Sequence, residues 1–310
     1  MLTRIGVVAL NTYREAVRAR VLHGLFALAI ATAGYCLVVG AFALNSSLRV
    51  VSDLGAASIS IYGIVVAVVL GATSLYRELE LKTIFPILAR PIRRSEYLLG
   101  KYLGTVLTLA VFIAANSGVL LLALGAQAGR PVALPLGIAA SATLVACVLA
   151  FRLSRARTYL PIPWAILVLL AGAYLAGGAP DDRRVVLGSA LLTLAEVALV
   201  TAIATLFSAF SSPFLSAIFT FGLFAVGRSA DTLARLPVRV FGQFLASAGA
   251  FLAKLVPNLM LYVPPRPLLT GEASGPSLAS YLGMAVLHSF AWSVLLLACA
   301  SILFRRRDFL

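Results

Sequence analysis

Long apolar stretches separated by short connections dominate this sequence. A transmembrane α-helix needs about 20 consecutive, predominantly apolar residues, and several stretches approach that length. The pattern predicts an all-α integral membrane protein with about six to eight transmembrane helices. The smaller number results if 132–178 forms a hairpin that does not fully cross the membrane. We expect the spans near 22–44, 58–76, 99–125, 132–150, 161–178, 186–210, 212–227 and 280–304.

The composition supports this class. Hydrophobic residues make up 61% of the chain and charged residues 12%, and the mean hydropathy is +1.02. A soluble domain has about 45–50% apolar and about 25% charged residues. The three cysteines lie far apart inside apolar stretches, which is typical neither of a disulfide framework nor of a metal site. We expect a single membrane domain over 1–310 that binds no metal.

The charge distribution predicts an orientation. A net charge of +14 would suggest a nucleic-acid partner in a soluble protein. Here most Lys and Arg lie in short connections beside apolar stretches, as the positive-inside rule predicts for cytoplasmic loops. We therefore expect no nucleic-acid partner and place both termini in the cytoplasm. The predominance of Arg over Lys is typical of a GC-rich bacterial genome, so the expected location is the bacterial inner membrane.

A charged stretch, 76–101, interrupts the apolar pattern after the second expected span. Glu78 and Lys82 have the spacing of a helical ion pair. Pro86 predicts a break in this helix, and Ser95 with Glu96 predicts the N-cap and first-turn acid of the next helix. An ordinary basic loop with a solvated face is the alternative interpretation. The apolar residues of the stretch share one helical face: Leu81, Ile84, Phe85 and Leu88.

Motifs in this stretch resemble the coupling-helix region of permeases in the ABC type-2 exporter superfamily. They differ from the family at Lys82, where glycine is usual, and at the additional Pro86. The segment 1–21 resembles the family's interfacial elbow helix, and the C-terminal end resembles that of its multi-copper-enzyme-maturation subgroup. The hairpin at 132–178 departs from the usual six spans. The residues that carry the resemblance are Arg77-Glu78-Leu79-Glu80, Thr83, Leu88, Pro91, Arg94, Leu99-Gly100-Lys101, Arg14-Glu15, Arg18, Arg20 and Phe304-Arg305-Arg306-Arg307-Asp308-Phe309.

The resemblance implies a function. Such permeases pair as dimers, with a second copy or a related chain, and each docks a separate ATP-binding subunit. ATP and Mg are bound by that partner, whose closure moves the cytoplasmic coupling region, 77–98 in this chain. The implied docking residues are Arg77, Glu78, Glu80, Thr83, Leu88, Pro91, Arg94 and Lys101.

The segment 228–279 is too polar to span but carries an apolar stripe, which is typical of external re-entrant or interfacial helices in contact with membrane lipid. The resemblance implies an external gate here, and a periplasmic accessory protein is a further expected partner. A surface cap over helix ends is the alternative. The expected gate residues are Phe241, Phe244, Leu245, Pro257 and Asn258.

Glu196 lies inside an expected span. An acid at the bilayer centre costs roughly 2.5–3.5 kcal/mol on insertion scales, so Glu196 must face the bundle, a partner or water. A place in the substrate path and a structural hydrogen bond both remain open. We expect His288 to be a packed residue and the sequence Asp181-Asp182-Arg183-Arg184 to be a self-neutralising external turn. Gly100 and Gly104 have the spacing of a close helix contact.

The sequence contains no phosphate-binding P-loop and none of the metalloprotease, nucleophile-elbow or CxxC patterns. We therefore expect no catalytic residues and no cofactor bound by this chain. Two other functions fit a membrane protein of this kind. An ion-gradient-driven secondary transporter predicts paired broken helices around buried ion ligands, and a non-transporting assembly factor predicts purification without an ATPase.

Overall fold

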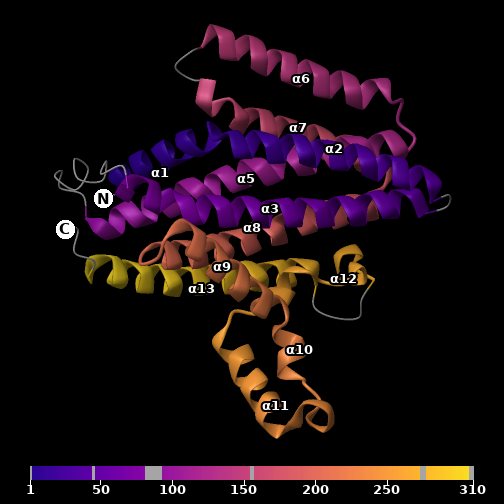
Figure 1. Cartoon of the computed structure of the whole chain (residues 1–310). Helices are drawn as coiled ribbons and strands as arrows, with labels where there is room; N and C mark the ends of the chain where they lie inside the picture. Colours follow the sequence, from indigo (N-terminus) through magenta and orange to yellow (C-terminus); the bar gives the residue numbers. More distant parts are fainter. Residues whose placement is uncertain (1, 44–45, 81–92, 154–156, 273–276, 307–310) are drawn as a thin grey trace.

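The computed structural model describes residues 2–43, 46–80, 93–153, 157–272 and 277–306. Every regular element in these ranges is helical, and eight helices are long and apolar enough to span a membrane. The protein is therefore an all-α, multi-pass membrane protein, as the hydrophobic pattern predicts (Figure 1). The elements are α1 (Leu2–Val17), α2 (Arg20–Phe42), α3 (Ser47–Glu80), α5 (Arg94–Gln127), α6 (Ala133–Arg152), η2 (Arg157–Tyr159), α7 (Pro161–Leu175), η3 (Ala176–Gly178), α8 (Pro180–Ser208), α9 (Pro213–Arg228), α10 (Ala230–Ala234), α11 (Val238–Leu255), η4 (Leu259–Tyr262), α12 (Arg266–Thr270) and α13 (Leu278–Arg306).

Seven of the expected spans coincide with helices that meet the length and apolarity of a span. The remaining one, 212–227, is α9, whose 16 residues reach about 24 Å against a hydrocarbon core of about 30 Å. The eighth helix of sufficient length is instead α11, which lies in the segment expected to be interfacial. Apolarity alone does not separate these two helices, because both are rich in Phe, Val and Leu.

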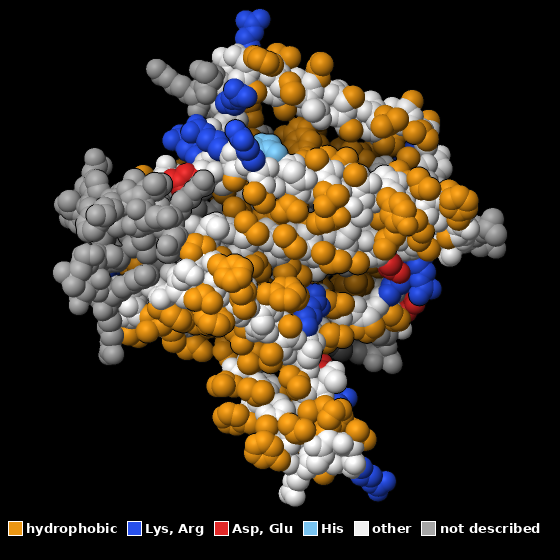
Figure 2. All heavy atoms as spheres, viewed as in Figure 1, with side chains coloured by type: hydrophobic (Ala, Val, Ile, Leu, Met, Phe, Trp, Pro, Cys, Tyr) orange, Lys and Arg blue, Asp and Glu red, His pale blue; other side chains and the backbone are white. Residues whose placement is uncertain are grey.

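The long helices run along one common axis, and the two ends of the chain lie at the same end of this bundle (Figure 1). α8 packs against α3 and α13, and α5 packs against α1, α3 and α7. α6 lies at the edge of the bundle beyond α7, and the α10–α11 pair projects from the opposite side (Figure 1). The surface in Figure 2 is largely hydrophobic, as expected of helices that face lipid.

α3 and α5 are the longest helices. Each has 34 residues and is therefore about 51 Å long, well beyond the hydrocarbon thickness of about 30 Å. α3 ends at Glu80 and α5 begins at Arg94, and both of these ends lie at the end of the bundle where the termini are (Figure 1). The two helix ends that flank the predicted charged stretch therefore lie at the same end of the bundle (Figure 1).

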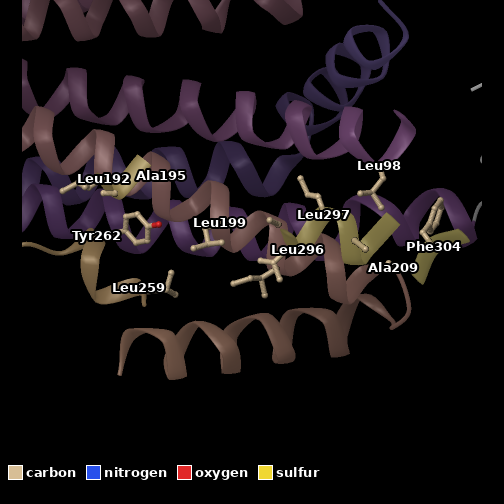
Figure 3. Close-up of a cluster of buried hydrophobic side chains, with 14 of the residues drawn as sticks. Leu98, Leu192, Ala195, Leu199, Ala209, Leu259, Tyr262, Leu296, Leu297 and Phe304 are labelled. Atoms are coloured by element: carbon tan, nitrogen blue, oxygen red, sulfur yellow. The ribbon is translucent and has the colours of Figure 1, made fainter. Parts of the chain in front are cut away.

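One apolar core lies between α5, α8, α13 and η4 (Figure 3). α8 contributes Leu192 and Leu199, and α13 contributes Leu296 and Leu297. η4 closes the core from the side with Leu259, which is fully buried. The short segment after α11 is thus anchored in the bundle, although α11 itself is largely exposed.

Helices α1 and α5 approach closely because two glycines face α1. A Cβ at Gly100 would lie 2.6 Å from Val8 Cβ, and a Cβ at Gly104 would lie 2.4 Å from the Ala9 carbonyl oxygen. Real side chains do not tolerate these distances. The spacing of Gly100 and Gly104 therefore serves the close helix contact that it predicts.

Replacing Gly104 with alanine is expected to lower the thermal unfolding midpoint of the purified chain, because the new methyl group meets backbone of α1 that cannot rotate away. Overpacking of this kind costs about 1–3 kcal/mol. Gly137→Ala is the matched control, since nothing lies within 4 Å of its Cβ position. An equal midpoint for both variants would contradict the tight α1–α5 contact.

Candidate functional site

Three of the expected docking residues lie on the last turn of α3: Arg77, Glu78 and Glu80. The structure describes their backbone as helical and not their side chains. Thr83, Leu88 and Pro91 lie outside the described residues, as do the apolar stripe from Leu81 and the break expected at Pro86. The backbone of the first three nevertheless lies at the end of α3, at the end of the bundle where the termini are (Figure 1).

The start of α5 differs from the prediction by two residues. The N-cap is Arg93, whose backbone N–H donates to the Glu96 carboxylate at 3.1 Å. Ser95, predicted as the N-cap, lies inside the first turn instead. A carboxylate three residues after the N-cap can accept a hydrogen bond from the free backbone N–H of the N-cap. Glu96 lies three residues after Arg93, so this hydrogen bond identifies Arg93 as the N-cap. The first-turn acid Glu96 is confirmed.

Arg94 connects two helix ends at this end of the bundle. Its Nη1 donates to the Phe304 carbonyl oxygen of α13 at 3.2 Å. Carbonyl groups in the last turn of a helix have no partner within the helix, and a guanidinium there also favours the helix dipole. Arg94 therefore ties the first turn of α5 to the last turns of α13.

Lys101 is buried. Its side chain is 4% exposed, and Nζ lies 3.3 Å from the Glu15 carboxylate of α1. In the structure this ammonium group therefore points to α1 rather than to the outer surface. A buried Lys needs such a counter-charge, so the pair fixes α1 on α5 beside the glycine contact.

Glu196 forms an ion pair inside the bundle. Its side chain is fully buried, and Arg228 Nη2 lies 3.0 Å from Oε1 and 3.2 Å from Oε2. Only the contact with Oε2 has hydrogen-bond geometry. Ser60 Oγ of α3 also approaches Oε2, at 3.5 Å. The acid therefore faces the bundle, where it links α8 to the end of α9 and to α3.

A second ion cluster lies at the opposite end of the bundle from the termini and holds α12 against α3 and α8. Arg266 donates one Nη to Asp53 and Ser52 and the other to Asp182, the latter at 2.5 Å. Burial lowers the pKa of Arg266, but the hydrogen bonds and charges of Asp182 and Asp53 outweigh this effect and raise the pKa above its ordinary value. A group whose pKa is raised on folding contributes its full stability below its pKa in the unfolded chain and loses it only as the pH rises through its pKa in the folded chain. Both values lie far above neutral pH for an arginine, so the contribution of Arg266 is present at neutral pH.

This cluster corrects the prediction of a self-neutralising turn at Asp181-Asp182-Arg183-Arg184. Arg184 does pair with Asp181 at 3.6 Å, with both side chains more than half exposed. Asp182 instead bonds Arg266, 84 residues further along the chain. The turn prediction considered only neighbours in sequence, whereas α12 brings a distant arginine against the start of α8.

The expected gate segment has two parts with different surroundings. Phe241, Phe244 and Leu245 lie on α11 and are exposed at 45%, 82% and 54%. Pro257 and Asn258 lie between α11 and η4. Pro257 is buried and Asn258 is partly buried.

The predicted α11 stripe is interrupted. Gly242 has φ +76° and ψ 163°, so Phe241 and Phe244 do not share one continuous helical face as the spacing predicts. Glycine tolerates this left-handed φ at no steric cost. The remaining stripe, from Phe244 to Leu255, is exposed on a single amphipathic helix, which is the form that interfacial helices take.

Asn258 fixes the connection after α11. Its Nδ2 donates to Asp231 of α10 at 2.8 Å, and its Oδ1 accepts from the Met260 backbone N–H at 2.9 Å. The residue before it, Pro257, places its carbonyl oxygen 2.8 Å from the Cβ position of Gly227. This connection is therefore packed against the end of α9, in contrast to α11.

His288 is a packed residue, as expected of a histidine on an apolar helix. Tyr262 Oη and His288 Nδ1 are 2.9 Å apart, and the two rings lie 6.0 Å apart. Because Tyr262 belongs to η4, this contact adds a polar link to the apolar core of Figure 3. Its role is to hold η4 on α13.

Three residues that form ion pairs in the structure were not predicted from the sequence: Arg228, Arg266 and Asp53. Arg228 had an indirect signal, since a buried acid in a span requires a base and this arginine ends the next apolar stretch. Asp53 was assigned to the connection before a span expected to begin at 58, whereas α3 begins at Ser47. Nothing near Arg266 in sequence indicated its partners, which lie 84 and 213 residues away.

Comparison of the sequence with protein-family models gives no match, and comparison with curated proteins gives none either.

Proposed function

We propose that this chain is the membrane-spanning permease subunit of an ATP-driven exporter of the ABC type. A separate ATP-binding subunit docks at the tip of α3 and α5, where Arg77, Glu78 and Glu80 stand. The observation that carries the proposal is the length of α3 and α5, which have 34 residues each. At about 51 Å each helix is longer than the hydrocarbon core of about 30 Å.

The contacts of the two helices suit transmission of a movement from that tip. α3 packs along α8, and α5 packs along α1, α3 and α7. Arg94 and Lys101 add polar links to α13 and α1. Packed helices move as rigid bodies rather than deform, so displacement of the tip by a closing ATPase reaches the whole bundle.

The proposal includes the topology and the assembly. The end that carries both termini and the charged tip faces the cytoplasm of a bacterium, because connections at that end are rich in Arg. Two such chains form the transport path between them, and each carries one ATP-binding subunit with its ATP and Mg. We assign the gate to the segment 228–279, whose α12 then lies on the external side, toward the end of the bundle opposite the termini (Figure 1).

Co-expression with a candidate ATP-binding-cassette protein from the same genome tests the proposal. A tagged wild-type chain is expected to retain the ATPase through purification in detergent. The variant E78A/E80A is expected to retain at least about tenfold less, which corresponds to about 1.4 kcal/mol of binding free energy. D181A/E272A is the matched control, because it removes two exposed acids from the opposite end.

Failure of the wild-type chain to retain any ATPase would contradict the proposal and favour an assembly factor. Uptake or release of ions by the purified chain in vesicles without ATP would favour a secondary transporter. Equal retention by both double variants would leave the complex in place and exclude the tip of α3 as its docking surface.

A further inference from the structure

A cavity lies between α6 and the rest of the bundle. Its volume is about 720 Å³, within the range of small-molecule sites. It is bounded by α2, α5, α6 and α7 and by the short segments that precede α2 and α7. The cavity exists because α6 lines it with small side chains, Thr143, Ala146, Cys147 and Ala150, which do not fill the space to its neighbours.

One end of this cavity is basic. Arg18, His23 and Arg157 line it and are exposed, and no Asp or Glu is among the described residues that line it. His23 Nδ1 lies 3.0 Å from the Ala19 carbonyl oxygen, so this nitrogen carries a proton and donates. Figure 2 shows basic side chains and a histidine gathered in this part of the surface, at the end of the bundle where the termini lie.

The position of Arg157 is fixed by its neighbour Tyr159. The Tyr159 ring stacks on Tyr13 of α1, with centroids 6.3 Å apart and planes 7° apart. The Arg14 guanidinium lies over the same ring at 4.8 Å. These contacts hold η2 against α1, and they keep Arg157 on the same rim as Arg18.

The other part of the cavity is apolar and rigid. Phe26 packs edge-to-face on Phe112 and on Trp164, with centroids 6.1 and 6.0 Å apart. The aromatic rings therefore form an apolar wall of the cavity.

We propose that this cavity binds an anionic phospholipid from the surrounding membrane. The phosphate lies at Arg18 and Arg157, where guanidinium groups give charge-assisted hydrogen bonds. An acyl chain lies along Phe26, Phe112 and α6. Basic pockets between membrane helices recognise anionic head groups in this way. The inference concerns the α6–α7 hairpin and does not rest on the proposed ATPase partner.

Fluorescence quenching by brominated lipids tests this site. The chain has two tryptophans, so W292F leaves Trp164 as the single reporter. In nanodiscs, brominated phosphatidylglycerol is expected to quench Trp164 at a mole fraction about tenfold lower than brominated phosphatidylcholine, as two arginines beside an anionic lipid imply. R18Q/R157Q in the same background is expected to abolish this preference. R152Q is the control, because Arg152 is exposed at the same end of α6 but does not line the cavity.

A second variant distinguishes the effect of the cavity's volume from the effect of its charged end. Ala146→Phe fills the chamber without changing any charge and is expected to reduce quenching by both lipids. Equal quenching by the two lipids in the W292F chain would mean contact with bulk lipid only and would overturn the proposal. Relief of quenching by glycerol 3-phosphate would identify a free phosphate ester as the ligand and would overturn it as well, whereas the lipid proposal expects no relief.

Discussion

Replacing Arg228 with methionine is expected to destabilise the protein by about 3–5 kcal/mol, the cost of leaving one partner of a buried ion pair unpaired. Glu196 is fully buried, so its carboxylate cannot turn to water when the guanidinium is lost. Ser60, at 3.5 Å, offers one long hydrogen bond and no charge. The measurement is the denaturant midpoint of the purified chain, followed by near-UV circular dichroism.

A double variant tests whether the unpaired charge of Glu196 causes this loss of stability. R228M/E196Q removes both charges and is expected to regain most of the lost stability, because a neutral amide costs far less to bury than a carboxylate. R239M is the matched control, since Arg239 is exposed on α11. If R228M alone unfolds at the same midpoint as the wild-type chain, the pair contributes nothing and α9 is held by apolar contacts only.

This pair also explains how a short helix is accommodated. α9 is about 24 Å long and ends at Arg228, so its last carbonyl groups lie beside the middle of α8 rather than beyond the membrane. The guanidinium at that end interacts favourably with the helix dipole and pairs with Glu196. The chain then leaves the bundle through α10, and Asn258 holds that exit to the segment that returns through η4.

The sequence determines the helices of this protein more fully than their roles. Apolar length alone identified α2, α3, α5, α6, α7, α8 and α13, because a lipid environment leaves the backbone no alternative to helix. The same criterion could not separate α9 from α11. α9 packs on α3 and α8, whereas α11 carries its apolar stripe exposed outside the bundle, and this difference is set by tertiary contacts.

Candidate site residues were predictable where their role depends on local pattern. Glu96 was found as a first-turn acid, and Gly100 with Gly104 as a close helix contact. The family resemblance implied a docking role for Lys101, whereas in the structure Lys101 pairs with Glu15 of α1, which lies 86 residues earlier in the sequence. Ion pairs between distant elements leave no periodic signal in a single sequence.

Replacing Arg266 with methionine is expected to release the segment 259–270 from the bundle. Arg266 gives hydrogen bonds to two carboxylates and to Ser52, and each bond to a charged group contributes about 1.5–3 kcal/mol. The loss also leaves Asp182 without the Arg266 cation, and it leaves Asp53 with only the exposed Arg49, at 3.8 Å. The local opening free energy of α12 is therefore expected to fall by about 3 kcal/mol or more, which corresponds to at least about a hundredfold faster amide exchange.

Hydrogen exchange followed by mass spectrometry measures this effect peptide by peptide. The increase is expected in 259–270 and in the first turns of α3 and α8, and not in α5 or α7. R266K is expected to lie between the wild-type chain and R266M, because an ammonium group keeps the charge but cannot bond two carboxylates with the fixed fork of a guanidinium. R235M serves as the control, since Arg235 is exposed after α10. Unchanged exchange in 259–270 of R266M would show that the apolar contacts of Leu259 and Leu269 hold this segment without the ion cluster.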